Sequence, residues 1–202
     1  NNAATTWPKP EDTASAMFDF ITHGGANLAR GSASERDIKT LDGVYTCRSE
    51  LAELFGGYER HSAKYLTFTS CITESLNVIL KGVAGQGMRI VTSSMEHNAV
   101  IRPLRSLEGA GLCVDVVQCS MRGYLDPKSV DVALERHAYL AVFSHCSNVS
   151  GSLQDLAAIA EVCARHSVPL VVDSAQTAGI VPIDAEELGL AALCFTGHKG
   201  LM

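Results

Sequence analysis

Short apolar runs alternate with segments of helical periodicity along most of this chain, and this alternation constrains the fold more than any other feature. The apolar runs span residues 65–69, 89–92, 112–117, 138–143, 168–172 and 191–195. Helical periodicity is found over about 73–83, 98–108, 128–135, 154–166 and 185–188. Because parallel strands need crossover connections and are covered on both faces, this order predicts an α/β fold with a largely parallel sheet between two layers of helices.

The first third of the chain has fewer signals. Residues 1–13 are predicted to be a lead-in segment to one large domain over residues 14–202, since 202 residues suffice for one substantial core. Helices are expected at 11–20 and from Ser34, because a serine followed three residues later by an acidic residue is typical of a helix start. The pair Gly56-Gly57 is expected to end the second helix.

Composition bears on the partners and the compartment. The chain carries a formal charge of −6 without a dense run of basic residues, which argues against a nucleic-acid partner. No apolar stretch reaches the length of a membrane span. Seven cysteines without a CxxC pair favour neither a disulfide framework nor a zinc site. We therefore expect no metal site, no membrane or nucleic-acid contact, and a cytoplasmic location.

Polar clusters follow the apolar runs, and the ligands of open parallel sheets bind beyond the carboxyl ends of the strands. The clusters are Ser70-Cys71-Ile72-Thr73, Ser93-Ser94-Met95-Glu96-His97-Asn98, Ser144-His145-Cys146-Ser147-Asn148, Asp173-Ser174-Ala175-Gln176 and Thr196-Gly197-His198-Lys199. The sheet would bring them to one rim. Each residue taken alone also has a structural interpretation: Asp173 and Thr73 as helix caps, His97 as a core histidine, Asn148 as a turn residue, and Lys199 as a solvated surface lysine.

One chemistry uses all these residue types together, namely that of pyridoxal 5'-phosphate. Lys199 would bind the aldehyde as a Schiff base, and Asp173 would keep the pyridine nitrogen protonated. His97 would stack on the ring. The phosphate would be held by four residues, some beside a helix N-terminus, where free N–H groups and the helix dipole favour an anion. These four are Ile72, Thr73, Thr196 and His198.

The sequence also resembles a known family, the class V branch of the fold-type I pyridoxal-phosphate enzymes, which includes cysteine desulfurases and selenocysteine lyases. The segments that carry the resemblance are Asn2-Ala3-Ala4-Thr5-Thr6, Thr69-Ser70-Cys71-Ile72-Thr73-Glu74-Ser75-Leu76-Asn77, Glu96-His97-Asn98-Ala99-Val100, Ser147-Asn148-Val149-Ser150-Gly151, Asp173-Ser174-Ala175-Gln176 and Thr196-Gly197-His198-Lys199. The resemblance implies the three-layer α/β/α large domain of the pyridoxal-phosphate-dependent transferases. It also implies a homodimer.

The resemblance extends the roles of the site residues. Lys199 would also move the proton of the substrate α-carbon, so Lys199 and His97 are the predicted catalytic residues. Gln176 would lie near the ring hydroxyl, and Asn148 near the ring and the substrate. The family usually has a glycine where Cys71 stands, so a side chain at this position is expected to affect the phosphate turn.

The implied reaction is the release of sulfur from L-cysteine to give alanine, with a possible sulfur-acceptor protein. The family's sulfur-accepting cysteine and carboxylate-binding arginine, and its small domain, lie beyond the lysine and cannot be assigned here. We therefore expect the first part of a longer protein. The alternatives are another class V reaction, such as selenocysteine or cystine lysis or transamination, and an inactive fragment. A dinucleotide-binding enzyme is disfavoured, because no GxGxxG follows the first apolar run.

Overall fold

The computed structural model describes residues 2–28 and 34–202, and its centre is a five-stranded sheet. The strands are β1 (Arg89–Ser93), β2 (Cys113–Val117), β3 (Leu140–Ser144), β4 (Leu170–Asp173) and β5 (Ala192–Cys194). They lie in the order β2-β1-β3-β4-β5, and every neighbouring pair is parallel. The predicted parallel sheet is therefore confirmed for five of the six apolar runs.

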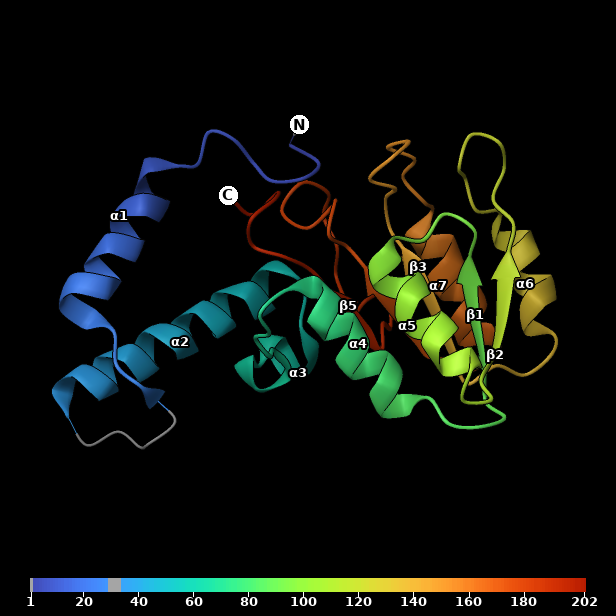
Figure 1. The fold of residues 1–202 in the computed structure, drawn as a ribbon, viewed down its shortest axis with the longest axis horizontal. Helices are drawn as coiled ribbons and strands as arrows, with labels where there is room; N and C mark the ends of the chain where they lie inside the picture. The colour runs from blue at the N-terminus through green and yellow to red at the C-terminus, as the bar shows by residue number, and fades with distance from the viewer. Residues whose placement is uncertain (1, 29–33) are drawn as a thin grey trace.

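Helices connect the strands and extend to one side of them (Figure 1). Their bounds are α1 (Glu11–Asp19), α2 (Glu35–Leu54), α3 (Tyr58–His61), α4 (Ile72–Val83), α5 (Asn98–Glu108), α6 (Pro127–Leu134) and α7 (Leu156–Arg165), with a π-helical turn η1 (Phe20–Gly24) and a 3-10 turn η3 (Ala63–Tyr65). The two ends of the chain lie near each other in the upper part of this view, above α2 and α4 and to the left of β1, β2 and β3. The helix expected near 185–188 is a hydrogen-bonded turn instead.

Two hydrophobic clusters, one on each face of the sheet, make up the core. Successive strand residues point to opposite faces, so Ile90 joins the cluster that contains α4 and α5 residues, while Val91 joins the cluster that contains α6 and α7 residues. The same division holds in β3, where Val142 belongs to the first cluster and Phe143 to the second. This alternation produces the predicted three layers, helix, sheet and helix.

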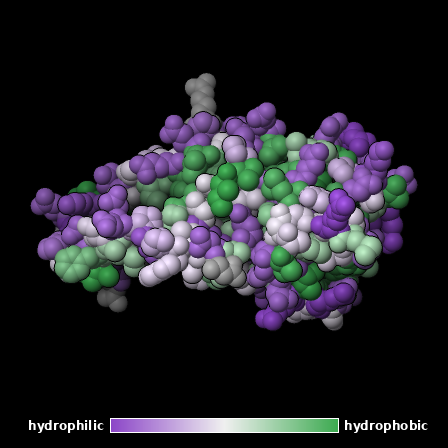
Figure 2. All heavy atoms as spheres, turned by 90° about the horizontal axis from the view of Figure 1, so that it is seen from above, coloured by the Kyte–Doolittle hydropathy of each residue, from purple (hydrophilic) through white to green (hydrophobic). Residues whose placement is uncertain are grey.

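The long helix α2 begins where the sequence predicts. The Ser34 side chain accepts a hydrogen bond from the Asp37 N–H, and the Asp37 carboxylate accepts one from the Ser34 N–H, which is a reciprocal capping box. The helix ends at Leu54, just before Gly56-Gly57. Within α2 only Thr40 and Ala52 are buried, so most of this helix lies outside the core. Hydrophobic and hydrophilic side chains are interspersed on the face that Figure 2 shows.

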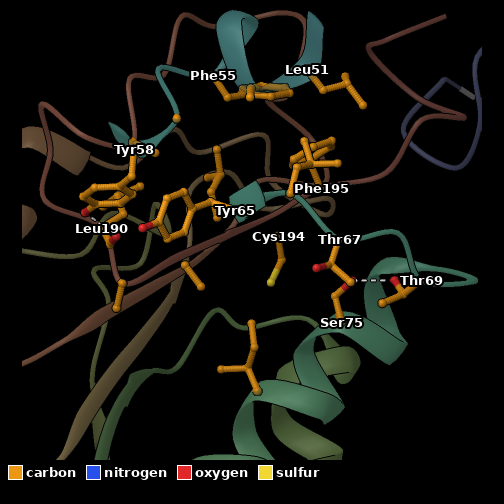
Figure 3. Close-up of a pocket in the computed structure, with 18 of the residues that line it drawn as sticks. Leu51, Phe55, Tyr58, Tyr65, Thr67, Thr69, Ser75, Leu190, Cys194 and Phe195 are labelled. Carbon is orange, nitrogen blue, oxygen red and sulfur yellow. Dashed lines mark hydrogen bonds between the residues drawn. The ribbon is translucent and has the colours of Figure 1, made fainter. Parts of the chain in front are cut away.

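The strand expected over 65–69 is not formed, and this prediction was wrong. Tyr65 ends the turn η3, residues 66–69 are irregular, and the Tyr65 and Phe68 side chains are about half exposed. A hollow of about 400 Å³ lies between this segment and β5, one of the two edge strands, and Phe55, Tyr58 and Phe195 line it (Figure 3). A strand needs a neighbour for its backbone hydrogen bonds, and in the part of the chain described here none lies beside 65–69.

Candidate functional site

The carboxyl ends of β1, β3 and β4 surround a small hollow with a polar lining. Its lining residues are Ile72, Met95, His97, Ser144, Cys146, Ser147, Asn148, Asp173, Ala175, Gln176 and Lys199. Six of the nine residues predicted for the site are among them, namely Ile72, His97, Asn148, Asp173, Gln176 and Lys199. Five chain segments that are far apart in the sequence therefore meet at one place, as the strand-end argument predicted.

Asp173 is the last residue of β4 and only 4% exposed. Its Oδ1 accepts a hydrogen bond from the Ala175 N–H at 2.9 Å, while no described residue donates to Oδ2. Burial raises the pKa of Asp173, and the positive charges of His97 and Lys199 act in the opposite direction. No helix begins after Asp173, so the helix-cap interpretation is wrong, and a cationic ligand group would relieve the cost of this buried charge.

His97 is exposed and lies at the N-cap of α5. Its Nδ1 accepts a hydrogen bond from the Ala99 N–H at 3.1 Å, which fixes the ring against the first turn of the helix. The alternative interpretation of His97 as a core histidine is therefore wrong. The His97 side chain and the Asp173 carboxylate line the same hollow.

Helix α4 presents its N-terminus to the same region. Its N-cap is Cys71, which makes no side-chain capping bond, so the interpretation of Thr73 as the cap is wrong. Cys71 has extended backbone angles (φ −167°, ψ 164°) that any residue can adopt, and its side chain is exposed. Thr73 and His97 line a neighbouring hollow together with Lys81 and Arg102. Lys81 lies in the last turn of α4, so the helix N-terminus together with Arg102 is what favours an anion beside the site.

The lead-in segment contacts the lysine loop directly. The Thr6 N–H donates to the His198 carbonyl at 3.1 Å, and the Thr6 hydroxyl donates to the Lys199 carbonyl at 2.6 Å. The Thr5 hydroxyl donates to the same His198 carbonyl at 3.0 Å. The Gln176 amide donates to the carbonyl of Ala3 at 3.0 Å, so this segment also reaches a predicted site residue. Sequence reasoning noted the segment but assigned no role to these threonines.

A tight backbone contact fixes the other side of the lysine loop. Gly179, which has a positive φ of 78°, lies in the turn after β4, and a Cβ at this position would be 2.5 Å from the carbonyl oxygen of Gly200. A Cβ on Gly200 would be 2.3 Å from the Ala178 carbonyl oxygen. The two glycines therefore allow a close approach between the turn after β4 and the backbone next to Lys199 that a residue with a Cβ would not permit.

The remaining predicted residues lie beside the hollow or next to it. Thr196 is 9% exposed, and His198 is exposed, with Nδ1 3.2 Å from the Thr5 hydroxyl. Neither lines the hollow, so the structure does not bring these two together with the other six. The sequence analysis placed Glu96 and Ser144 in the polar clusters but assigned neither a role, because their only signals were the place of Glu96 beside His97 and of Ser144 at the end of an apolar run.

Two searches of the described residues concern other kinds of site. No cluster of three or more His, Cys, Asp or Glu side chains in 2–28 and 34–202 is arranged to hold a metal ion. No helix in these two ranges is both long enough and apolar enough to cross a membrane.

Comparisons with known proteins agree with this geometry. Residues 1–202 match the family described as Aminotransferase class-V. The cysteine desulfurases IscS of Klebsiella pneumoniae and Escherichia coli are each 33% identical to the chain over 201 residues. These matches cover 97% of this chain and 49% of each relative, so the chain spans about half the length of the curated relatives it matches.

Solved structures show the same fold. The apo cysteine desulfurase from Thermococcus onnurineus NA1 has a TM-score of 0.86 at 26% identity, covering 99% of this chain and 49% of that one. A structure described as a NifS-like protein has a TM-score of 0.89 at 26% identity, with coverages of 98% and 54%. SspA in complex with cysteine has a TM-score of 0.88 at 25% identity, with coverages of 99% and 58%. These likenesses confirm the predicted fold class, which is that of the pyridoxal-phosphate-dependent transferases.

Proposed function

This chain belongs to the aminotransferase class-V family, and from that membership we propose that it forms the cofactor-binding part of a cysteine desulfurase that uses pyridoxal 5'-phosphate. The observation that carries the proposal is the buried Asp173 carboxylate, whose Oδ2 accepts no hydrogen bond from a described residue, in one hollow with the Lys199 amine and the His97 ring. An acid, an amine and a flat ring are the groups that this cofactor requires.

When bound, pyridoxal phosphate supplies an electron-withdrawing ring that stabilises negative charge on the α-carbon of an amino acid. The carboxylate of Asp173 would hold a proton on the ring nitrogen. Lys199 would bind the aldehyde carbon and later move the substrate proton, and the threonine contacts to its loop fix the backbone from which it reaches. His97 would cover one face of the ring, with Gln176 and Asn148 at its rim.

The phosphate would lie at the N-terminus of α4. Ile72 and Thr73 belong to its first turn, where backbone N–H groups point out of the helix. Arg102 lines the same hollow as Thr73 and adds positive charge. Thr196 and His198 remain proposed phosphate ligands, although neither lines the hollow with the other residues.

The substrate and the partners follow from the relatives. We propose that the protein releases sulfur from L-cysteine to give alanine, and that a further protein accepts the sulfur; another class V reaction is the alternative. We also propose a homodimer. Its support is a hollow of about 900 Å³ between α1, η1 and α2, which is lined by the exposed apolar side chains of Met17, Phe20, Ile21 and Phe68. Exposed free cysteines such as Cys47 favour a reducing, cytoplasmic location.

An absorbance titration tests the cofactor and the lysine together. We expect purified protein to take up pyridoxal phosphate and to gain a visible absorbance band, which Lys199→Ala abolishes and Lys128→Ala, an exposed lysine on α6, leaves in place. Protein that never takes up the cofactor, or a band that persists in Lys199→Ala, would contradict the proposal. With an added thiol reductant to release the transferred sulfur as sulfide, alanine formed from L-cysteine in step with sulfide then separates desulfuration from transamination.

A further inference from the structure

A carboxylate outside the proposed set of site residues ties two strand ends together beneath the hollow. Glu96 Oε1 accepts a hydrogen bond from the Ser93 hydroxyl at 2.6 Å, at the end of β1. Its Oε2 accepts from the Ser144 N–H at 2.8 Å and from the Ser144 hydroxyl at 2.7 Å, at the end of β3. Glu96 is partly buried, and three donors from two neighbouring strands converge on its carboxyl group.

Glu96 is linked to the site on two sides. The next residue is His97, whose ring is held by the first turn of α5, so Glu96 anchors the backbone from which that ring projects. On the other side, Ser144 lines the hollow and is the β3 partner of Asp173 in the sheet register. The hydrogen bonds of Glu96 therefore connect the His97 loop with the strand that lies beside the Asp173 carboxylate.

We propose that Glu96 is a positioning residue of the cofactor site, which locks the His97 loop to the end of β3 and interacts through space with the Asp173 carboxylate. The inference rests on the proposed function, because the positions of His97 and Asp173 matter for binding only if both contact the cofactor. Glu96 is not among the residues that line the hollow, so it would act through these neighbours.

The electrostatics give Glu96 a second effect on the site. Burial raises the pKa of Glu96 to about 7, against the hydrogen bonds from Ser93 and Ser144, which lower it, and the Asp173 charge raises it further. The charged groups around Asp173 are His97, on the loop, and Lys199, on the lysine loop; both favour its ionised form. Ionised Glu96 adds negative charge near Asp173 and so favours a protonated ring nitrogen there. Cofactor binding should therefore tighten as Glu96 loses its proton.

Two substitutions separate the lock from the charge. In Glu96→Gln the amide oxygen can still accept both Ser144 donors and the amide N–H can donate to the Ser93 oxygen, but the side chain cannot ionise. In Glu96→Ala the three donors lose their acceptor, and the buried Ser144 N–H is left unpaired. Glu161→Gln, an exposed carboxylate on α7, is the matched control for the loss of one charge.

The test measures the dissociation constant of pyridoxal phosphate for the whole protein at about pH 6 and about pH 8, either side of the Glu96 pKa of about 7. Between the lower and the higher pH, the affinity of wild type and of Glu161→Gln should increase about threefold more than the affinity of Glu96→Gln. Glu96→Ala should bind the cofactor about tenfold more weakly than wild type at both pH values. The second readout is amide hydrogen exchange over residues 95–99 in cofactor-free protein, which should speed up in Glu96→Ala and not in Glu96→Gln.

The outcomes distinguish this inference from the proposed function. If wild type takes up no cofactor, the proposed function fails, while the exchange measurement still tests the lock. If Glu96→Ala leaves both affinity and exchange unchanged, the lock is refuted; if Glu96→Gln keeps the pH dependence of wild type, the interaction with Asp173 is refuted. Should Glu96→Ala fail to fold, Ser144→Ala removes one donor and should speed exchange over 95–99, and unchanged exchange there would also refute the lock.

Discussion

Replacing Gly179 with alanine tests whether the backbone contact beside the lysine loop is rigid. A Cβ at Gly179 would be 2.5 Å from the carbonyl oxygen and 2.7 Å from the carbonyl carbon of Gly200, and both are backbone atoms that cannot rotate away. The residue also has a φ of 78°, which disfavours any side chain. Gly87 is a matched control, because its φ is 77° and a Cβ there would meet nothing within 4 Å.

The control isolates the backbone cost from the steric cost. Gly87→Ala should lower the free energy of unfolding by about 1–2 kcal/mol, the cost of a left-handed conformation with a Cβ. Gly179→Ala carries the same cost and adds about 1–3 kcal/mol for the forced separation of two packed segments. Its total loss is therefore about 2–5 kcal/mol. The overlap between the new Cβ and the Gly200 carbonyl group can be relieved by a shift of the loop that carries Lys199.

Urea unfolding followed by circular dichroism measures the loss of unfolding free energy in each variant. A titration with pyridoxal phosphate measures cofactor affinity, which depends on the position of the lysine loop. We expect Gly179→Ala to bind the cofactor more weakly and Gly87→Ala to bind it as wild type does. If the two variants lose stability to within about 0.5 kcal/mol of each other and bind the cofactor equally, the contact between the glycines is not rigid and our account of how Lys199 is placed is refuted.

Two further predictions concern buried charges. Folding raises the pKa of Glu96 from 4.5 to about 7, so between these pH values the carboxyl group is protonated in the folded chain and ionised in the unfolded chain. The free energy of unfolding of wild type, measured relative to Glu96→Gln, should therefore fall by about 3 kcal/mol as the pH rises across this interval. Above the interval the difference should stay constant. Urea unfolding over a pH series checks this, and a difference that is constant with pH would contradict it. Arg89 is buried in β1 and donates to the Asp115 carboxylate and to backbone carbonyls before β3, so Arg89→Lys, which lacks the planar fork, should cost about 2–3 kcal/mol by thermal or urea unfolding. Arg165→Lys, whose ion pair with Asp131 is exposed, should cost less than about 0.5 kcal/mol, and equal losses would refute the distinction.

The sequence predicted the sheet and most of the site because both depend on local signals. Five of the six apolar runs, 138–143 among them, form strands of the sheet, and the polar residues that follow these strands meet because parallel strands share one edge. His97, Asp173 and Lys199 could therefore be placed together without coordinates. The start of α2 was equally predictable, since a capping box involves residues three positions apart.

What could not be predicted depends on contacts between distant segments. The run 65–69 has the composition of a strand, but whether it becomes one depends on a neighbour that its own sequence does not specify. The hydrogen bonds of Thr5 and Thr6 to the lysine loop join residues about 190 positions apart, and an irregular segment has no periodicity that would indicate them. Glu96 was missed because its burial follows from Ser93 and Ser144, which bear no motif.

The outer side of β5 has a consequence for handling this chain in solution. No strand within 2–28 or 34–202 pairs with that side, and the aromatic side chains of Phe55 and Phe195 stack at 4.4 Å between ring centroids in the hollow next to it. Unpaired backbone groups along the edge of a strand, next to an apolar hollow, can form hydrogen bonds with any extended peptide, which then adds to the sheet as a further strand. At high concentration the isolated 202-residue chain is therefore prone to aggregate through the free edge of β5, unless an extended segment pairs with that edge.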